Sequence, residues 1–144
     1  MVDVTVAVTI DEPRAYVAEY AADPSNVPNW YRNIKTVELL TDGPLRVGSQ
    51  MAFVAQFLGH TLSYTYEVVD LVSGERLVMR TAQGPFPMET TYSWETIGDA
   101  TLMKMRNRGE PAGFSRFVAP FMATAIRRAT QKDLTRLKAL LETT

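Results

Sequence analysis

Residues 113–141 read GFSRFVAPFMATAIRRATQKDLTRLKALL and carry apolar residues at helical spacing. At about 100° per residue, the front half is apolar over an arc of roughly 180°, wider than the ~100° stripe of an ordinary surface helix. That arc consists of Phe114, Phe117, Val118, Phe121, Met122, Ala125, Ile126 and Ala129. In the back half the stripe narrows, and basic side chains take the direction that the aromatic residues faced. The stripe is then Leu137, Leu140 and Leu141, and the basic residues are Arg128, Lys132 and Arg136. The spacing predicts a long helix whose front half roofs a cavity and whose back half packs onto the body.

Pro120 interrupts this segment. A proline costs ~3 kcal/mol in a helix interior but is tolerated in a first turn. We therefore expect a bend or a fresh helix start within residues 117–120 and a regular helix over residues 121–141. Residues 109–120 would then form a flap over the mouth of the cavity.

The composition limits the class of protein. A chain of 144 residues that is 46% hydrophobic can bury a real core, so we expect a single domain over residues 1–144. The formal charge of −1 gives no general attraction to nucleic acid, and we expect no such partner. The absence of cysteine from the sequence excludes disulfides, thiolate nucleophiles and zinc sites built on sulfur.

The sequence also bears on location. Its first ten residues, MVDVTVAVTI, alternate and include an acidic residue, unlike a signal peptide, and no run approaches the ~18 apolar residues of a membrane span. We expect a cytoplasmic protein without stable membrane insertion. The basic face of the last helix is most simply a solvated face; the alternative is a lipid carrier that binds a membrane surface.

Hydrophobic periodicity predicts the other elements. Residues Val2–Ile10 alternate as in a half-buried strand, a short helix ends near Ala22, and Asp23-Pro24 starts a second brief turn. A strand follows at residues 34–40, and the chain then reads as successive antiparallel hairpins. The order is one strand, two short helices, six antiparallel strands and one long helix, which predicts an α+β fold.

Three two-residue turns set the register of the hairpins, because a turn fixes which side chains face each other. Gly59-His60 would place Phe57 opposite Leu62 and Phe53 opposite Tyr66. Ser73-Gly74 would place Tyr66 opposite Thr81 and Val68 opposite Met79. Gly98-Asp99 would place Tyr92 opposite Met105, Thr90 opposite Asn107 and, on the outer face, Glu89 opposite Arg108.

The predicted inner face of the sheet mixes large apolar groups with hydroxyls and an amide. A buried polar group without a partner costs on the order of 1 to 3 kcal/mol, so these groups need one another, water or a bound molecule. An apolar pocket with a few convergent polar groups is the usual form of a small-molecule site. The alternative is a solid core without a ligand cavity, in which the tyrosine hydroxyls reach the edge of the sheet.

Signals for catalysis are weak. The predicted register places no Asp or Glu on the inner face, and the lone histidine, His60, falls in a turn, where it is either an exposed turn residue or a proton carrier at the pocket mouth. One histidine without cysteine supplies no recognisable metal site, and we expect neither a metal nor a cofactor. Tyr64, Tyr66, Tyr92 and Asn107 remain candidate hydrogen-bond donors to a carbonyl or enolate, or plain packing residues.

The chain resembles the START-like superfamily, also called SRPBCC, and within it the bacterial polyketide cyclase/dehydratase branch. The similar residues span nearly the whole chain: Ile10-Asp11-Glu12-Pro13, Asp23-Pro24, Pro28-Asn29-Trp30, Val47-Gly48, Gly98-Asp99-Ala100-Thr101, and the run from Arg106 to Phe121. The resemblance implies the helix-grip fold, in which a seven-stranded twisted antiparallel sheet wraps around a long C-terminal helix and a deep cavity lies between them. It implies no common catalytic triad.

From these observations we expect the chain to bind a hydrophobic small molecule, such as a lipid, a polyketide or an aromatic metabolite, between the sheet and the last helix. The alternative is a polyketide cyclase/dehydratase-type enzyme acting on an aromatic precursor. We expect a monomer or a homodimer. The predicted ligand-binding residues are Phe53, Phe57, Tyr64, Tyr66, Met79, Thr90, Tyr92, Met105, Asn107, Phe117, Phe121, Met122 and Ala125.

Overall fold

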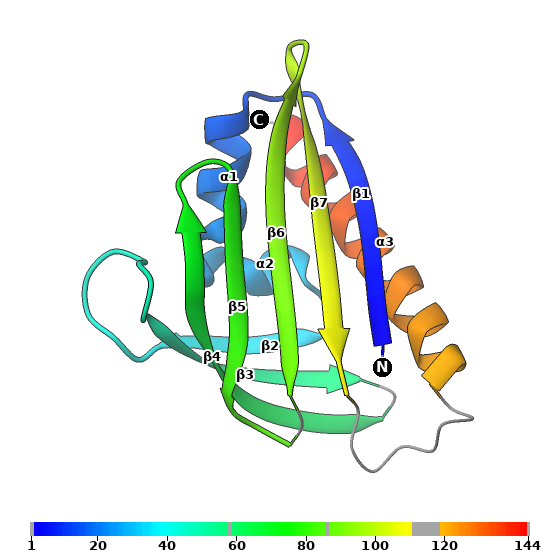
Figure 1. Ribbon diagram of the computed structural model, residues 1–144. Coiled ribbons are helices and arrows are strands. Elements are labelled where there is room, and N and C mark those ends of the chain that lie inside the picture. Colours follow the sequence, from blue (N-terminus) through cyan, green and yellow to red (C-terminus); the bar gives the residue numbers. More distant parts are fainter. Residues whose placement is uncertain (1, 58, 86, 111–118, 144) are drawn as a thin grey trace.

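The computed structural model of the protein describes residues 2–57, 59–85, 87–110 and 119–143 (Figure 1). Seven strands and the helices follow in the predicted order. They are β1 Val2–Ile10, α1 Arg14–Ala22, the 3₁₀ turn η1 Pro24–Asn26, α2 Val27–Trp30, β2 Ile34–Leu39, β3 Gln50–Phe57, β4 His60–Val72, β5 Arg76–Gln83, β6 Met88–Ile97, β7 Ala100–Gly109 and α3 Ala119–Glu142.

The strands form one antiparallel sheet in the order β1-β7-β6-β5-β4-β3-β2. Figure 1 shows β2 and β3 running across the direction of β5, β6, β7 and β1, so the sheet curls strongly. The long strand β4 takes part in both directions, and its pairing with β5 shifts between Val68 and Asp70, a bulge of the kind that bends a strand. The predicted α+β helix-grip fold is confirmed.

Two of the three predicted registers are confirmed. Tyr92 faces Met105, Thr90 faces Asn107 and Glu89 faces Arg108 across β6 and β7. The predicted pairing of β4 with β5, which includes Val68 opposite Met79, also holds. The connection between these two strands is longer than predicted, since β4 ends at Val72 and β5 begins at Arg76, and the bulge after Val68 restores the register.

The register between β3 and β4 was predicted wrongly. Phe57 faces His60 and Phe53 faces Tyr64, so the turn lies one residue earlier than Gly59-His60. The physical reason is that Gly59 has φ of +79° and takes the second position of the turn, where a left-handed backbone is needed. Because the partner moves by two residues, every inward side chain keeps its predicted face.

Helix α3 lies along β1 and crosses the concave side of the sheet (Figure 1). Its back half buries Leu134, Leu137 and Leu141 at 0 to 2% exposure, whereas Leu140, which was predicted in the same stripe, is 38% exposed. Pro120 stands at the second position of the described helix, as expected of a proline in a first turn. The predictions for Phe114, Phe117, Val118 and most of the flap lie outside the described residues.

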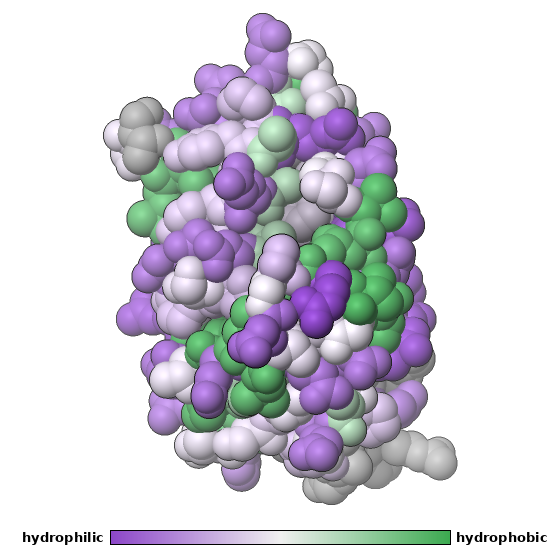
Figure 2. Space-filling model, turned by 90° about the vertical axis from the view of Figure 1, so that its left-hand side faces the viewer, coloured by the Kyte–Doolittle hydropathy of each residue, from purple (hydrophilic) through white to green (hydrophobic). Residues whose placement is uncertain are grey.

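Apolar residues also lie on the surface. Leu39, Leu40 and Val47 are 41, 49 and 59% exposed, and they belong to the edge strand β2 and its connection to β3. Figure 2 shows the side of the molecule where this connection projects, with apolar groups between hydrophilic ones. Among the helices of the described residues, none combines the length and the hydropathy that a membrane span requires.

Candidate functional site

A cavity of about 130 Å³ lies between the sheet and the front half of α3. An apolar cavity of ~150 Å³ suffices to admit a molecule the size of benzene in other proteins. Side chains from the sheet, from the segment after α2 and from α3 line it together. The described lining residues are Val2, Tyr31, Asn33, Ile34, Phe53, Ala55, Leu62, Tyr64, Tyr66, Met79, Met88, Thr90, Tyr92, Asn107, Arg108, Gly109, Met122, Ile126, Ala129 and Thr130.

Most of the residues predicted to bind a ligand lie at this cavity. The structure brings together Phe53, Tyr64, Tyr66, Met79, Thr90, Tyr92, Asn107 and Met122. The side chains of Phe57 and Phe117 are outside the described part of the chain. Ligand contact by any of these residues stays a prediction.

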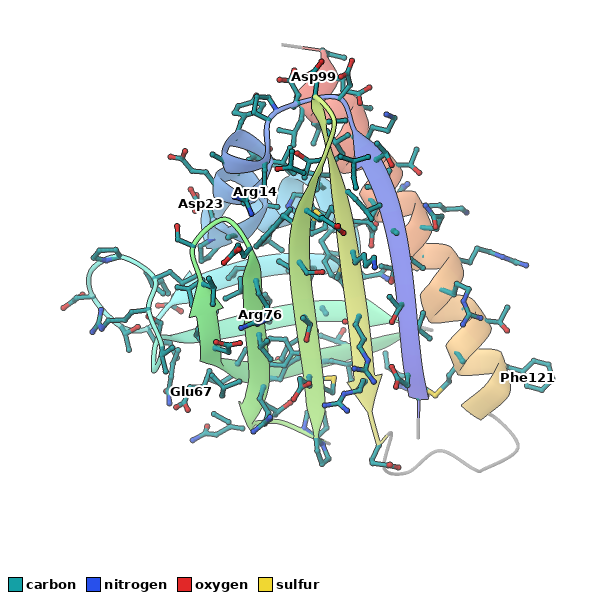
Figure 3. All side chains as sticks on the ribbon, turned by 45° about the horizontal axis from the view of Figure 1, so that its top comes forward. Arg14, Asp23, Glu67, Arg76, Asp99 and Phe121 are labelled. Atoms are coloured by element: carbon teal, nitrogen blue, oxygen red, sulfur yellow. The ribbon has the colours of Figure 1, made fainter. Side chains whose placement is uncertain are left out.

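Three residues were expected at the cavity and lie elsewhere. Phe121 is 77% exposed, and Figure 3 shows its side chain pointing away from the sheet. Met105 is completely buried in the core, where it faces Val6 on β1 and Tyr92 on β6, and does not line the cavity. Ala125 is half-buried one turn after Phe121 and also lies outside the lining.

The helical spacing explains the misplacement of Phe121 and Ala125. The helix buries a stripe that runs from Met122 to Leu141, with Thr130, Asp133, Leu134 and Leu137 between them. At about 100° per residue, Phe121 points within roughly 20° of Arg128 and Lys132, which are exposed. The basic residues of the back half therefore indicate the solvent side of the whole helix. The predicted apolar arc of the front half was wider than the stripe that the helix buries.

The sequence reading missed the wall of the cavity that follows α2. Tyr31 is the C-cap of α2, and Asn33 and Ile34 lead into β2. Hairpin register says nothing about Tyr31 and Asn33, because both precede the first paired residue of β2, Ile34. The one available signal was the adjacent Trp30, an aromatic residue next to Tyr31 in an otherwise short turn, which is completely buried.

Four tyrosines form the polar side of the cavity. Burial raises the pKa of Tyr66 to about 12, with a hydrogen bond to Thr90 acting against the shift and the neighbouring Glu89 acting with it. Burial likewise raises the pKa of Tyr31, Tyr64 and Tyr92 well above the ordinary value, and the other phenols add to each shift. All four therefore keep their protons at neutral pH and act as neutral O–H groups.

Three polar groups form a relay on the sheet. The Tyr66 Oη and Thr90 Oγ1 atoms are 2.9 Å apart, and Thr90 Oγ1 donates to Asn107 Oδ1 at 2.8 Å. The Thr90 hydroxyl has one proton and gives it to Asn107, so Tyr66 must be the donor to Thr90. The remaining amide nitrogen, Asn107 Nδ2, is enclosed and makes no close hydrogen bond to the described residues. It faces the oxygen of Tyr31 and lowers the pKa of that phenol, against the larger effect of burial.

Aromatic contacts hold these phenols in place. Tyr64 stacks on Phe53 with ring centroids 5.3 Å apart, and Tyr66 meets both rings edge to face. Trp30 contacts Tyr31 at 5.6 Å and Tyr92 at 5.7 Å, so one buried indole supports two tyrosines from different elements. The polar wall is therefore built on rigid neighbours, as a selective site requires.

A buried carboxylate on α3 was not singled out from the sequence. Asp133 is 2% exposed, and its Oδ1 accepts from the Arg32 backbone N–H and from Arg136 Nη1, both at 3.2 Å. Burial raises its pKa, and these contacts partly offset the shift. Its Oδ2 is enclosed without a partner among the described residues. The charge of Asp133 also raises the pKa of Tyr31 and Tyr92, which places it within electrostatic reach of the cavity.

The lone histidine lies away from the cavity. His60, which was predicted to fall in a turn, is exposed at the start of β4 and is not among the described lining residues. Within residues 2–57, 59–85, 87–110 and 119–143, no group of three or more metal-binding side chains is found. The described lining also contains no carboxylate.

Comparison with known proteins points to one family. A family model described as "Polyketide cyclase / dehydrase and lipid transport" matches residues 1–142. A search of curated proteins found no significant match to the sequence.

Solved structures with the same fold are similar over almost the whole chain. TTHA0849 from Thermus thermophilus has a TM-score of 0.84 at 16% identity, covering 99% of both chains. A START superfamily protein from Mycobacterium smegmatis has a TM-score of 0.80 at 16% identity, covering 98% of this chain and 97% of the other. The ZhuI aromatase/cyclase from Streptomyces sp. R1128 has a TM-score of 0.78 at 17% identity, covering 97% and 93%. At such identities the likeness establishes the fold.

Proposed function

We propose that this chain, which belongs to the polyketide cyclase/dehydrase and lipid transport family, binds a small aromatic molecule between the sheet and α3. The observation that carries this proposal is the cavity of about 130 Å³, which has aromatic and methionine walls and a cluster of tyrosine hydroxyls. Such a site has the form of a small-molecule pocket, since it is mostly apolar with a few convergent polar groups.

The size of the cavity favours an aromatic metabolite over a lipid. Pockets for drug-sized ligands have volumes of about 300 to 1,000 Å³. This cavity is smaller than that range and close to the ~150 Å³ that accommodates one benzene ring. A single substituted ring fits a space of this size, whereas a long acyl chain exceeds it.

Two alanines on α3 offer a matched test of binding. Ala129 lines the cavity and Ala125 does not, although both are half-buried on the same helix. We expect Ala129→Phe to fill the cavity and abolish binding of ethylbenzene, a probe with one ring, while Ala125→Phe leaves binding unchanged. Binding is measured by ligand-observed NMR, with the melting temperature of each variant as a control for folding. Equal binding by the two variants would show that the ligand does not occupy this cavity.

A second candidate is an enzyme of the cyclase/dehydratase type that acts on an aromatic precursor. The observation that favours it is the group of tyrosines that line the cavity, because phenol donors can stabilise the charge that develops on an enolate oxygen. Under this proposal, Tyr64→Phe, Tyr92→Phe and Asn107→Leu should each lower turnover of a linear poly-β-ketone. Tyr16→Phe, on the outer face of α1, is the control. Unchanged turnover in all three variants would remove the candidate.

A further inference from the structure

The cavity contains more hydrogen-bond donors than acceptors. Among the described residues, no acceptor takes the hydroxyl protons of Tyr31, Tyr64 and Tyr92, although all three line the cavity. Tyr66 differs, because its proton is taken by Thr90. A phenol O–H without an acceptor loses free energy on burial, so each of these hydroxyls needs water or a ligand atom that accepts.

Few acceptors are available in the wall itself. The described lining contains no Asp or Glu, and the carbonyl of Asn107 already receives the Thr90 proton. Asn107 Nδ2 and Arg108 Nε add two more enclosed donors without a close partner in the described chain. A ligand that offers acceptors therefore matches this surface, and a ligand that offers only donors does not.

Two of the tyrosine donors share one buried neighbour, Trp30. Tyr31 and Tyr92 come from the end of α2 and from β6, and both rings contact Trp30 at centroid distances of 5.6 and 5.7 Å. Both tyrosines line the same cavity, and Tyr31 raises the pKa of Tyr92 after the larger effect of burial. Phe53 and Met79 provide apolar surface elsewhere in the same cavity.

Negative charge lies behind these donors. Asp133, three positions beyond the lining residue Thr130, acts on both Tyr31 and Tyr92 and raises the pKa of each. Its partner cation is Arg136, at 3.2 Å, and Arg136 does not line the cavity. A carboxylate placed against the two tyrosines would therefore meet a like charge.

Arg108 is the cation among the described lining residues, and it does not offset the negative charge near the cavity. Its Nη2 lies 2.6 Å from Glu89 Oε1, and Arg80 pairs with the other oxygen of Glu89 at 2.9 Å. The charge of Arg108 is thus already paired, and Glu89 acts on Tyr66 as a further negative group. A neutral oxygen accepts the same hydrogen bonds, and it avoids the free-energy cost of burying an anion near Asp133 and Glu89.

We infer that the cavity selects a neutral aromatic carbonyl compound, whose ring occupies the apolar space and whose oxygen accepts hydrogen bonds from the hydroxyls of Tyr31 and Tyr92. This inference rests on the proposed function, since it names the class of molecule that the same cavity would take. Tyr31 and Tyr92 are then the residues that determine specificity, and the apolar walls supply the general affinity.

Three probes of similar size test the inference: acetophenone has a neutral acceptor, benzoate an anionic one, and ethylbenzene none. Their dissociation constants are measured by NMR titration with the wild-type chain, Tyr31→Phe, Tyr92→Phe and the outer-face control Tyr16→Phe. We expect the wild type to bind acetophenone about tenfold more tightly than ethylbenzene, the change that one or two neutral hydrogen bonds produce. Benzoate should bind more weakly than acetophenone.

The variants make the outcomes distinguishable. Tyr31→Phe and Tyr92→Phe should lose most of the preference for acetophenone and still bind ethylbenzene, which also reports that the cavity is folded; Tyr16→Phe should match the wild type. If ethylbenzene binds as tightly as acetophenone, the acceptor preference is wrong while the proposed binding function stands. Tighter binding of benzoate than of acetophenone overturns the neutral class. Failure of all three probes to bind overturns the proposed function, and this inference with it.

Discussion

The two halves of α3 face the same sheet and do different things. The back half buries Leu134, Leu137 and Leu141, and its polar residues tie it to β1 and the chain just beyond it. Those ties are Gln131 Nε2 to the Ala7 carbonyl at 3.4 Å, Lys138 Nζ to the Thr9 carbonyl at 2.8 Å, and the Asp11 N–H to Glu142 Oε2 at 2.7 Å. The front half buries Met122, while Ile126 and Ala129 are half-buried against the cavity. One helix therefore holds the fold together at one end and leaves room for a ligand at the other.

The strongest test of this division compares two large-to-small substitutions. Leu137→Ala should lower the free energy of unfolding by about 2 to 5 kcal/mol, because it opens a cavity in a close-packed region. Ile126→Ala should cost less, since Ile126 already borders empty space and is only half-buried. Urea unfolding of both variants measures the difference. Equal costs would mean that the front half is packed as tightly as the back half.

Alkaline unfolding tests the tyrosine wall that faces the front half. The pKa of Tyr66 is raised to about 12 from an ordinary value of 10.0, chiefly by burial. Below pH 10 both the folded and unfolded chains keep this proton; between pH 10 and about 12 only the folded chain does, so the free energy of unfolding falls as pH rises. Tyr66→Phe should remove on the order of 2 kcal/mol of that fall by pH 12.

The matched control for this measurement is Tyr16→Phe, which changes a tyrosine on the exposed side of α1. Urea unfolding at several pH values from about 8 to about 12, on either side of the ordinary tyrosine pKa, gives the slope for each chain. Tyr66→Phe should have the shallower slope, even though it loses about 1 kcal/mol at neutral pH with its hydrogen bond to Thr90. A slope equal to that of the wild type would show that the Tyr66 hydroxyl is in contact with bulk water.

Asp133 lies where the two halves of α3 meet, and its removal tests the junction. Asp133→Ala leaves the Arg32 N–H without its acceptor and separates Arg136 from its ion pair, so we expect a loss of about 1 to 3 kcal/mol at neutral pH. Asp133→Asn keeps an acceptor oxygen and should lose less. Urea unfolding ranks the two variants, and an equal loss in both would show that the charge, and not the hydrogen bond to Arg32, holds the junction.

The same carboxyl has a predicted pH dependence. Its pKa is raised in the folded chain, chiefly by burial, so the stability that its proton contributes is present below the unfolded pKa and is lost as pH rises through the folded pKa. The wild type should therefore gain stability relative to Asp133→Asn as the solution is made acidic. A constant difference between the two chains from neutral to acidic pH would contradict the raised pKa.

The fold was predictable because its signals are local. Alternation fixed the faces of the strands, and the glycine turn at Gly98 fixed the pairing of Tyr92 with Met105. The face of each side chain also survived the wrong turn at Gly59, because an error of two residues preserves the period of two.

The site was only partly predictable, because a cavity depends on distances between elements that are far apart in the sequence. Tyr31 belongs to no periodic segment, and it becomes a wall residue only because Trp30 anchors α2 against Tyr92. Asp133 looks like one more charge on a polar helix. Its burial follows from the position of the Arg32 backbone N–H, which no pattern within α3 reveals.

The smallest expected effect is also the sharpest test of which side of α3 faces the sheet. If Phe121 covered the cavity, as its place in the apolar arc suggested, its truncation would cost about 3 to 5 kcal/mol and weaken ligand binding. With a side chain that is 77% exposed, Phe121→Ser should change the free energy of unfolding by no more than about 0.5 kcal/mol. Ethylbenzene binding should also be unchanged, whereas Met122→Ser, one residue further and 4% exposed, should lower stability and alter the cavity. Urea unfolding and NMR titration of the two variants compare neighbouring residues on one helix turn. A larger loss of stability and binding at Phe121 than at Met122 would mean that the helix is rotated by about 100° from the orientation described.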